Sequence, residues 1–313
     1  MQLIRHLPAR LADERPLALA IGNFDGLHRG HQALLAQAVE FAPASRPAML
    51  CFEPLPRTFF APDDPVPRVM KLRDKIDVAG QLGVEVVAQL RFDRAFSLQS
   101  PEAFARDVLA RDLNVGQIII GADFRFGHKA AGDSAAMAGY GRKFGFETII
   151  AETVVATTGG DDASGQRISS SRLRQALAAG DLALAEHLLG RPYAISGRVI
   201  RGQQLGRELG YATANLRVAE PPAFSGIAAV RVDGAGLSGH PGIASLGRRP
   251  TVAGRDWLLE AHLFDFDGDL YGQHLRVQFE GFIRHEEHFD SLTEMVEQMK
   301  RDVERANVLL TRR

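Results

Sequence analysis

The sequence contains little cysteine, almost no excess charge and no long hydrophobic run. Only Cys51 is a cysteine, so the chain cannot form an internal disulfide, and the reducing cytoplasm is the expected location. The 37 basic residues are balanced by 38 acidic ones, giving a net charge of −1. This balance predicts no nucleic-acid partner. No stretch approaches the length of a membrane span, and Arg5, His6 and Pro8 interrupt any secretory-signal pattern, so we expect no membrane association.

The length of 313 residues and the hydrophobic share of 45% are typical of a globular protein of about two domains. In the first half, short apolar runs alternate with helical patterns, which predicts a doubly wound parallel sheet with helices on both faces. Ser100 and Pro101 mark one helix start. The expected strands are Leu17–Gly22, Ala48–Phe52, Val84–Leu90, Gln117–Gly121 and Glu147–Val154.

After about Thr157 the pattern changes, and two short helices end near Leu189. Short strands broken by glycine follow, which predicts an antiparallel β-barrel. Ser291 and Glu294 have the spacing of a capping box, and the terminal helix that they begin is expected to cover one side of the barrel along Leu292, Met295, Val296, Met299 and Val303. The expected barrel strands are Ala194–Ile200, Gly226–Val232, Gly242–Leu246, Leu258–Phe266 and His274–Phe279.

The run Gly22–His31 follows the first strand directly and opens the first helix, where α/β domains bind nucleotides. His28 and His31 would share one side of the first helical turn, and Gly30 would leave room for a phosphate. Two imidazoles at the positive end of a helix can stabilise charge on a phosphorus undergoing displacement. The alternative is an ordinary turn whose histidines form a surface pair or bind a metal.

A second polar, glycine-rich run spans Gly202–Leu216 and can wrap phosphates. Within it, Thr213 and Asn215 would project to the same side of an extended chain and offer oxygens to a cation or phosphate. From spacing alone, a flexible hairpin with a buried Thr/Asn pair is favoured. Glu260 lies between two apolar residues of an expected strand, so it faces the opposite side from them and is either a proton acceptor or a solvated surface residue.

Several of these segments resemble one known family. The run G-N-F-D-G-L-H-R-G-H resembles the H-x-G-H signature of nucleotidylyltransferases, in the form typical of bacterial bifunctional riboflavin kinase/FMN adenylyltransferases. Arg167–Arg174 resembles the second element of that superfamily, with Ser171 in place of the usual threonine, and G-R-E-L-G-Y-A-T-A-N resembles the riboflavin kinase signature, with Tyr211 and Ala212 in place of phenylalanine and proline. Further similar segments are Phe52–Arg57, Gly121–Gly127, Leu246–Val252, Leu259–Gly272 and Phe282–Leu292.

The resemblance implies an FMN adenylyltransferase domain over residues 1–186 and a riboflavin kinase domain over residues 187–313, with Mg²⁺ as cofactor, ATP as co-substrate, and riboflavin, FMN and FAD as ligands. The implied catalytic residues are His28, His31 and Glu260. The implied nucleotide-binding residues are Gly22, Phe24, Arg167, Ser170, Ser171, Arg174, Gly202, Gly206 and Gly210. The implied flavin contacts are Asp123 and Phe124, and the implied metal ligands are Thr213 and Asn215. Asp123 has the alternative role of capping its own loop.

Two rival hypotheses remain. In the first, the loop altered at Ala212 slows the kinase, so that only adenylylation of supplied FMN survives. In the second, the chain is a non-catalytic flavin or nucleotide sensor. Retention of Glu260 argues against the sensor, because binding alone does not require a base.

Overall fold

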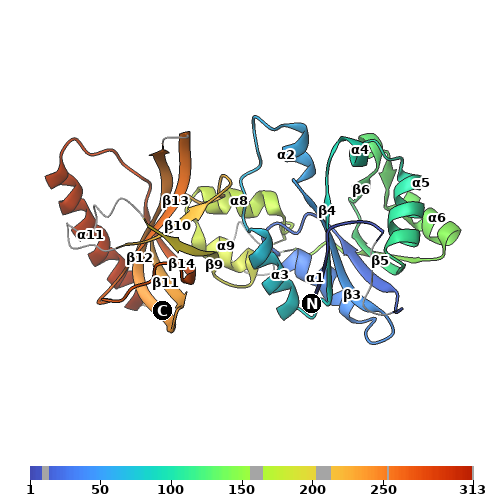
Figure 1. Ribbon diagram of the computed structural model, residues 1–313, viewed down its shortest axis with the longest axis horizontal. Coiled ribbons are helices and arrows are strands. Elements are labelled where there is room, and N and C mark those ends of the chain that lie inside the picture. Colours follow the sequence, from blue (N-terminus) through green and yellow to red (C-terminus); the bar gives the residue numbers. More distant parts are fainter. Residues whose placement is uncertain (9–13, 156–164, 202–212, 252–253, 312–313) are drawn as a thin grey trace. The chain divides into compact units, whose positions relative to one another are not determined.

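The computed structural model describes residues 1–8, 14–155, 165–201, 213–251 and 254–311 (Figure 1). The chain divides into two compact units. The first comprises Met1–Val66 and Lys71–Ser169, and the second comprises Pro67–Met70 and Ser170–Arg313. None of the described helices combines the length and hydrophobicity needed to cross a membrane.

The first unit contains a six-stranded parallel sheet in the order β1-β4-β3-β2-β5-β8, so the predicted fold is confirmed. The strands are β1 Gln2–Ile4, β2 Leu17–Ile21, β3 Arg46–Glu53, β4 Val86–Arg91, β5 Val115–Gly121 and β8 Glu147–Ala151. All five expected strands are present. The expectation omitted β1, which has only three residues and begins with a polar one.

Helices cover both faces of this sheet. Alternate residues of β2, including Leu17 and Leu19, share a hydrophobic cluster with Phe104 and Leu109, whereas the intervening residues face the opposite side. The helices are α1 Arg29–Val39, α2 Pro56–Phe60, α3 Leu72–Gln81, α4 Arg94–Ser97, α5 Pro101–Ala103 continuing into the π-helical segment η1 Phe104–Asp112, and α6 Ser134–Phe144. The predicted start at Ser100 is confirmed, because its hydroxyl accepts a hydrogen bond from the amide of Ala103 at 3.1 Å.

A small hairpin and a short helical turn follow β5. They are β6 Arg125–Phe126, the 3₁₀ turn η2 His128–Ala130 and β7 Gly132–Asp133. Because all strands of the main sheet are parallel, the segments that follow β2, β3, β4, β5 and β8 meet at one edge. This edge holds the motifs predicted for nucleotide and flavin binding.

The second unit contains a closed antiparallel barrel in the order β10-β13-β12-β11-β14-β9, as predicted. Its strands are β9 Tyr193–Ile200, β10 Thr213–Val218, β11 Gly226–Gly234, β12 Leu237–Thr251, β13 Gly254–Leu263 and β14 His274–Arg284. Its helices are α8 Ser170–Ala178, α9 Leu182–Leu189 and α11 Leu292–Thr311. The expectation placed the residues of β10 in a hairpin and made β12 much too short, because glycine and proline within β12 mimic turn signals.

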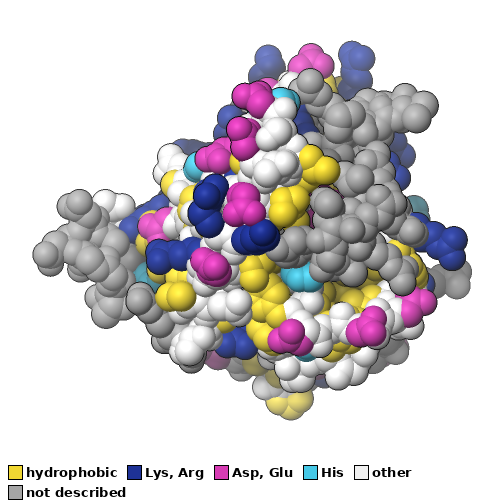
Figure 2. Space-filling view, turned by 90° about the vertical axis from the view of Figure 1, so that its left-hand side faces the viewer, with side chains coloured by type: hydrophobic (Ala, Val, Ile, Leu, Met, Phe, Trp, Pro, Cys, Tyr) yellow, Lys and Arg dark blue, Asp and Glu magenta, His cyan; other side chains and the backbone are white. Residues whose placement is uncertain are grey.

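The terminal helix α11 packs on the barrel, as predicted. The amide of Glu294 donates to the Ser291 hydroxyl at 3.2 Å, and Ala306 and Leu310 share a buried cluster with barrel residues. Leu292 was wrongly placed on this packed face: it is 57% exposed, and the residues of α11 in the buried cluster begin at Val303. On the face shown in Figure 2, basic and acidic side chains are interspersed.

Candidate functional site

The turn between β2 and α1 is tightly packed and conformationally strained. Phe24 and Leu27 are fully buried, yet their backbone φ angles are 49° and 45°, in the left-handed region that favours glycine. Such residues cost about 1–3 kcal/mol each and persist only where the surrounding structure holds them. Gly26, with φ at 90°, tolerates its conformation without this cost. The residues of this turn therefore fix one backbone conformation directly before the two histidines.

His28 and His31 lie together at the start of α1. His28 is the N-cap, and its Nδ1 accepts a hydrogen bond from the backbone amide of His31 at 3.3 Å. The two rings are stacked, with centroids 3.6 Å apart and planes 13° from parallel. An imidazole that accepts at Nδ1 carries its proton on Nε2, so the His28 ring presents a donor there. The positive end of the helix lies at the same place.

The alternative of a surface histidine pair is wrong, because His28 is only 5% exposed. Among the described residues, no group of three His, Cys, Asp or Glu side chains is placed to hold a metal ion. A side chain on Gly30 would meet the His28 ring at 3.2 Å, so this glycine makes room for the imidazole. Phe24 places its buried ring 5.1 Å from that of His31 and supports it from inside.

Asp123, in the loop after β5, forms an ion pair with Arg167. The distance is 2.8 Å, and the hydrogen bond from Arg167 lowers the pKa of the Asp123 carboxyl. The two come together because the amide of Ile168 donates to Val154, which places the Arg167 segment beside the chain that leaves β8. A predicted flavin contact and a predicted nucleotide contact are thus joined at the sheet edge. Both side chains are more than half exposed.

An aromatic surface at the same edge escaped the sequence prediction. Phe60 on α2 is 69% exposed, and its ring packs edge-on against Phe59 and Phe92, with centroids 5.2 and 5.8 Å away. The predicted flavin contact Phe124 stacks on Phe126 at 5.4 Å. The sequence does contain a signal for this surface. Two adjacent phenylalanines, Phe59 and Phe60, follow the Phe52–Arg57 motif segment and end the helix α2. An exposed aromatic surface of this kind suits a planar ring ligand.

The other predicted residues of the Arg167–Arg174 motif belong to the second unit. Helix α8 begins at Ser170, and Ser171 lies exposed in its first turn. Arg174 donates from Nε to the carbonyl of Pro67 at 2.8 Å.

Thr213 and Asn215 project to the same side of β10, as the spacing predicted. The Asn215 Nδ2 donates to the Thr213 carbonyl at 3.2 Å and lies 3.4 Å from its hydroxyl oxygen. Asn215 is 5% exposed, and among the described residues its Oδ1 has no hydrogen-bond partner. A buried carbonyl oxygen without a donor is costly unless a ligand satisfies it, and amide oxygens are ligands that Mg²⁺ accepts. The pair therefore fits a hard cation.

Glu260 on β13 lies directly opposite Asn215 in the strand register and also opposite Ser245 of β12. Its neighbours Leu259 and Ala261 are fully buried on the other face, so the predicted alternation is confirmed. Directly opposed residues of antiparallel strands bring their Cβ atoms to about 4.5–5.5 Å. Glu260 and Asn215 thus lie side by side on one face of the barrel sheet.

Glu286, a residue not predicted as part of the site, lies next to this pair through Ser245. Its carboxylate accepts a hydrogen bond from the Ser245 hydroxyl at 3.4 Å. The predicted phosphate-binding glycines Gly202, Gly206 and Gly210, together with Ala212, lie outside the described residues.

Comparisons with known proteins agree across both units. The family model described as FAD synthetase matches residues 11–172, and the model described as riboflavin kinase matches residues 189–310. The chain is 43% identical over 308 residues to the bifunctional riboflavin kinase/FMN adenylyltransferase of Escherichia coli (strain K12), covering 96% of each chain. It is 41% identical over 309 residues to the protein of the same name from Haemophilus influenzae, covering 98% of each. A crystal structure described as a macrolide-efflux protein from Streptococcus pneumoniae has a TM-score of 0.77 at 26% identity, covering 96% of this chain and 97% of that one.

Proposed function

The chain belongs to the family of bifunctional riboflavin kinases/FMN adenylyltransferases, and on that premise we propose that it phosphorylates riboflavin to FMN and then adenylylates FMN to FAD. ATP is the donor in both reactions. We assign adenylyl transfer to residues 1–186 and the kinase to residues 187–313, in the cytoplasm. The single observation that carries the proposal is the stacked histidine pair at the N-cap of α1, of which His28 is buried, at the sheet edge that also holds the Phe52–Arg57 and Gly121–Gly127 segments.

In adenylyl transfer, an oxygen of the FMN phosphate attacks the α-phosphorus of ATP while the bond from that phosphorus to the pyrophosphate oxygen breaks. Negative charge builds on the non-bridging oxygens. The Nε2–H of His28 and the ring of His31 stabilise that charge, helped by the helix end. Gly22 and Phe24 contribute through the backbone of the turn, since the side chain of Phe24 is buried. The protein needs no nucleophile of its own, because the FMN phosphate is the attacking group.

The flavin ring lies, in this proposal, against the aromatic surface at the sheet edge, with Asp123 and Phe124 among its contacts. The exposure of Phe60 supports this, because a large apolar ring left in water favours burial against a ligand. The other phosphate contacts rest on the family motifs: they are Arg167, Ser170, Ser171 and Arg174 for adenylyl transfer and Gly202, Gly206 and Gly210 for the kinase.

In the kinase reaction, Glu260 accepts the proton of the riboflavin ribityl hydroxyl as that oxygen attacks the γ-phosphorus of ATP, and ADP leaves. Thr213 and Asn215 would hold Mg²⁺ beside the phosphates. The ion would neutralise phosphate charge when bound. The Oδ1 of Asn215 has no hydrogen-bond partner among the described residues and lies directly across the register from Glu260, which supports this placement.

One assay tests the proposal against both rivals. The protein is incubated with riboflavin, ATP and magnesium, and riboflavin, FMN and FAD are resolved by chromatography. We expect FMN to rise first and FAD to follow. FAD formed only from supplied FMN would reduce the protein to one activity, and the absence of both products would support a sensor.

A further inference from the structure

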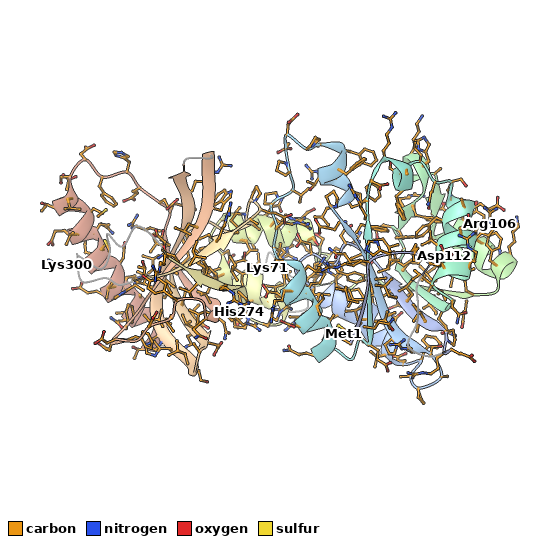
Figure 3. The ribbon with its side chains drawn as sticks, viewed as in Figure 1. Met1, Lys71, Arg106, Asp112, His274 and Lys300 are labelled. Carbon is orange, nitrogen blue, oxygen red and sulfur yellow. The ribbon has the colours of Figure 1, made fainter. Side chains whose placement is uncertain are left out.

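A buried lysine lies beneath the turn that carries the proposed adenylyl-transfer site. Lys75 sits on α3, one helical turn after Lys71, which Figure 3 labels. It is only 2% exposed. Its Nζ donates to the backbone carbonyl of Asn23, in the strained turn between β2 and α1, at 3.0 Å.

The Lys75 side chain has few polar contacts for a buried lysine. Among the described residues its single polar contact is the Asn23 carbonyl, and no carboxylate lies within ion-pair distance. Lysine is almost never fully buried unless paired, because burial of an unpaired charge is expensive. A hydrophobic side chain of similar length would fill the same space without that cost. A lysine at this position is therefore explained by the backbone carbonyl that its Nζ holds rather than by burial alone.

The contact also fixes the direction of one peptide group. In a planar trans peptide the carbonyl of one residue and the amide of the next point in opposite directions, so a carbonyl held by Lys75 directs the Phe24 N–H away from it. Among the described residues that N–H makes no hydrogen bond. The turn contains two non-glycine residues in the left-handed region, and each of them costs free energy. Without the contact to Lys75, the turn would lower its free energy by moving to another backbone conformation. His28 follows four residues after Phe24, so a change in the turn would also move the His28 ring.

We propose that Lys75 is a positioning residue for adenylyl transfer: through the Asn23 carbonyl it holds the turn, and so the Phe24 amide and the His28 ring, in the geometry that receives the ATP phosphates. The inference rests on the proposed function. Lys75 does not touch the reacting atoms. Its buried charge lies on the protein side of a turn whose other side faces an anionic substrate, so the charge is best compensated when the nucleotide is bound.

The test replaces Lys75 with methionine in the full-length protein, with Lys143→Met as the matched control. Lys143 is a largely exposed lysine of the same unit. We expect Lys75→Met to lower kcat for FAD formation roughly 100-fold, the effect of misplacing a reacting group by about 1 Å, with KM for FMN little changed. Its melting temperature should stay close to that of the parent, because loss of the hydrogen bond to Asn23 and removal of a buried amine have opposite effects on stability. Lys75→Arg, which keeps a charged donor, should recover part of the rate, and Lys143→Met should match the parent.

Urea unfolding of the same variants reports whether the first unit is intact, and their riboflavin kinase activity, which belongs to the second unit, should be unchanged in all of them. If Lys75→Met makes FAD at the parent rate, the proposal is overturned. It is equally overturned if the variant melts lower and regains the parent rate on cooling, because a purely structural role predicts that result. A parent protein that forms no FAD would instead refute the proposed function, so the two failures are distinguishable.

Discussion

Replacing His28 with alanine removes two interactions whose effects can be separated. The side chain caps α1 through Nδ1, and loss of such a cap costs about 0.5–2 kcal/mol of stability. The ring also presents its Nε2–H, and loss of one transition-state donor of this kind costs roughly 10²–10³-fold in kcat. A domain stable by about 5–15 kcal/mol remains folded after the first loss, so unfolding does not account for the second. We therefore expect a folded variant that forms FMN normally and FAD at least roughly 100-fold more slowly.

The chain offers a matched control for the cap. Helix α6 also has 11 residues, and its N-cap Asp133 accepts from the amide of Ala136 at 2.8 Å. Asp133→Ala should lose comparable stability in urea unfolding and keep the parent rate of FAD formation. His28→Asn retains a capping side chain but lacks the imidazole, so it should be stable and slow. The reasoning is refuted if His28→Asn recovers the parent rate, because capping would then be the whole role of His28.

Three further predictions concern the carboxylates and the cation site. Glu260→Gln should slow riboflavin phosphorylation roughly 10²–10⁴-fold and leave FAD formation from supplied FMN unchanged. The control Glu297→Gln, on the exposed face of α11, should change neither rate. If Glu260→Gln phosphorylates riboflavin at the parent rate at every magnesium concentration, Glu260 is not part of the kinase site. Asn215→Leu should raise the magnesium concentration needed for half-maximal kinase rate, and an unchanged requirement would contradict the cation assignment. In NMR titration, the pKa of Asp123 should lie below its ordinary value of 3.8 because of the ion pair with Arg167. The pair therefore stabilises the fold above pH 3.8, and this stabilisation is lost as the pH falls through the lowered pKa. Arg167→Gln should return the pKa of Asp123 towards its ordinary value.

Features fixed by local pattern could be predicted from the sequence. The continuous apolar run of β2 specifies a strand buried on both faces, and the alternation around Glu260 specifies the side of β13 on which it lies. Thr213 and Asn215 share a side because their spacing of two matches the period of a strand. In each case the residues that set the outcome are adjacent in the chain.

Contacts between distant segments could not be predicted in this way. Asp123 and Arg167 are 44 positions apart, and they meet because the chain leaving β8 passes beside β5 at the sheet edge. Lys75 reaches Asn23 across 52 positions. The four residues Pro67–Met70 join the second unit through the amide of Arg68, which donates to Pro221, and no composition signal in the sequence marks that pairing.

The most direct test of the central claim follows two labelled phosphates. Riboflavin, magnesium and the full-length protein are incubated with ATP labelled either at the γ-phosphate or at the α-phosphate, and FMN and FAD are separated and counted. A kinase followed by an adenylyltransferase predicts that γ-label enters both FMN and FAD, whereas α-label enters FAD alone and appears only after FMN has accumulated. Production of FAD without γ-label from riboflavin, or of FMN carrying α-label, would contradict the two-step account.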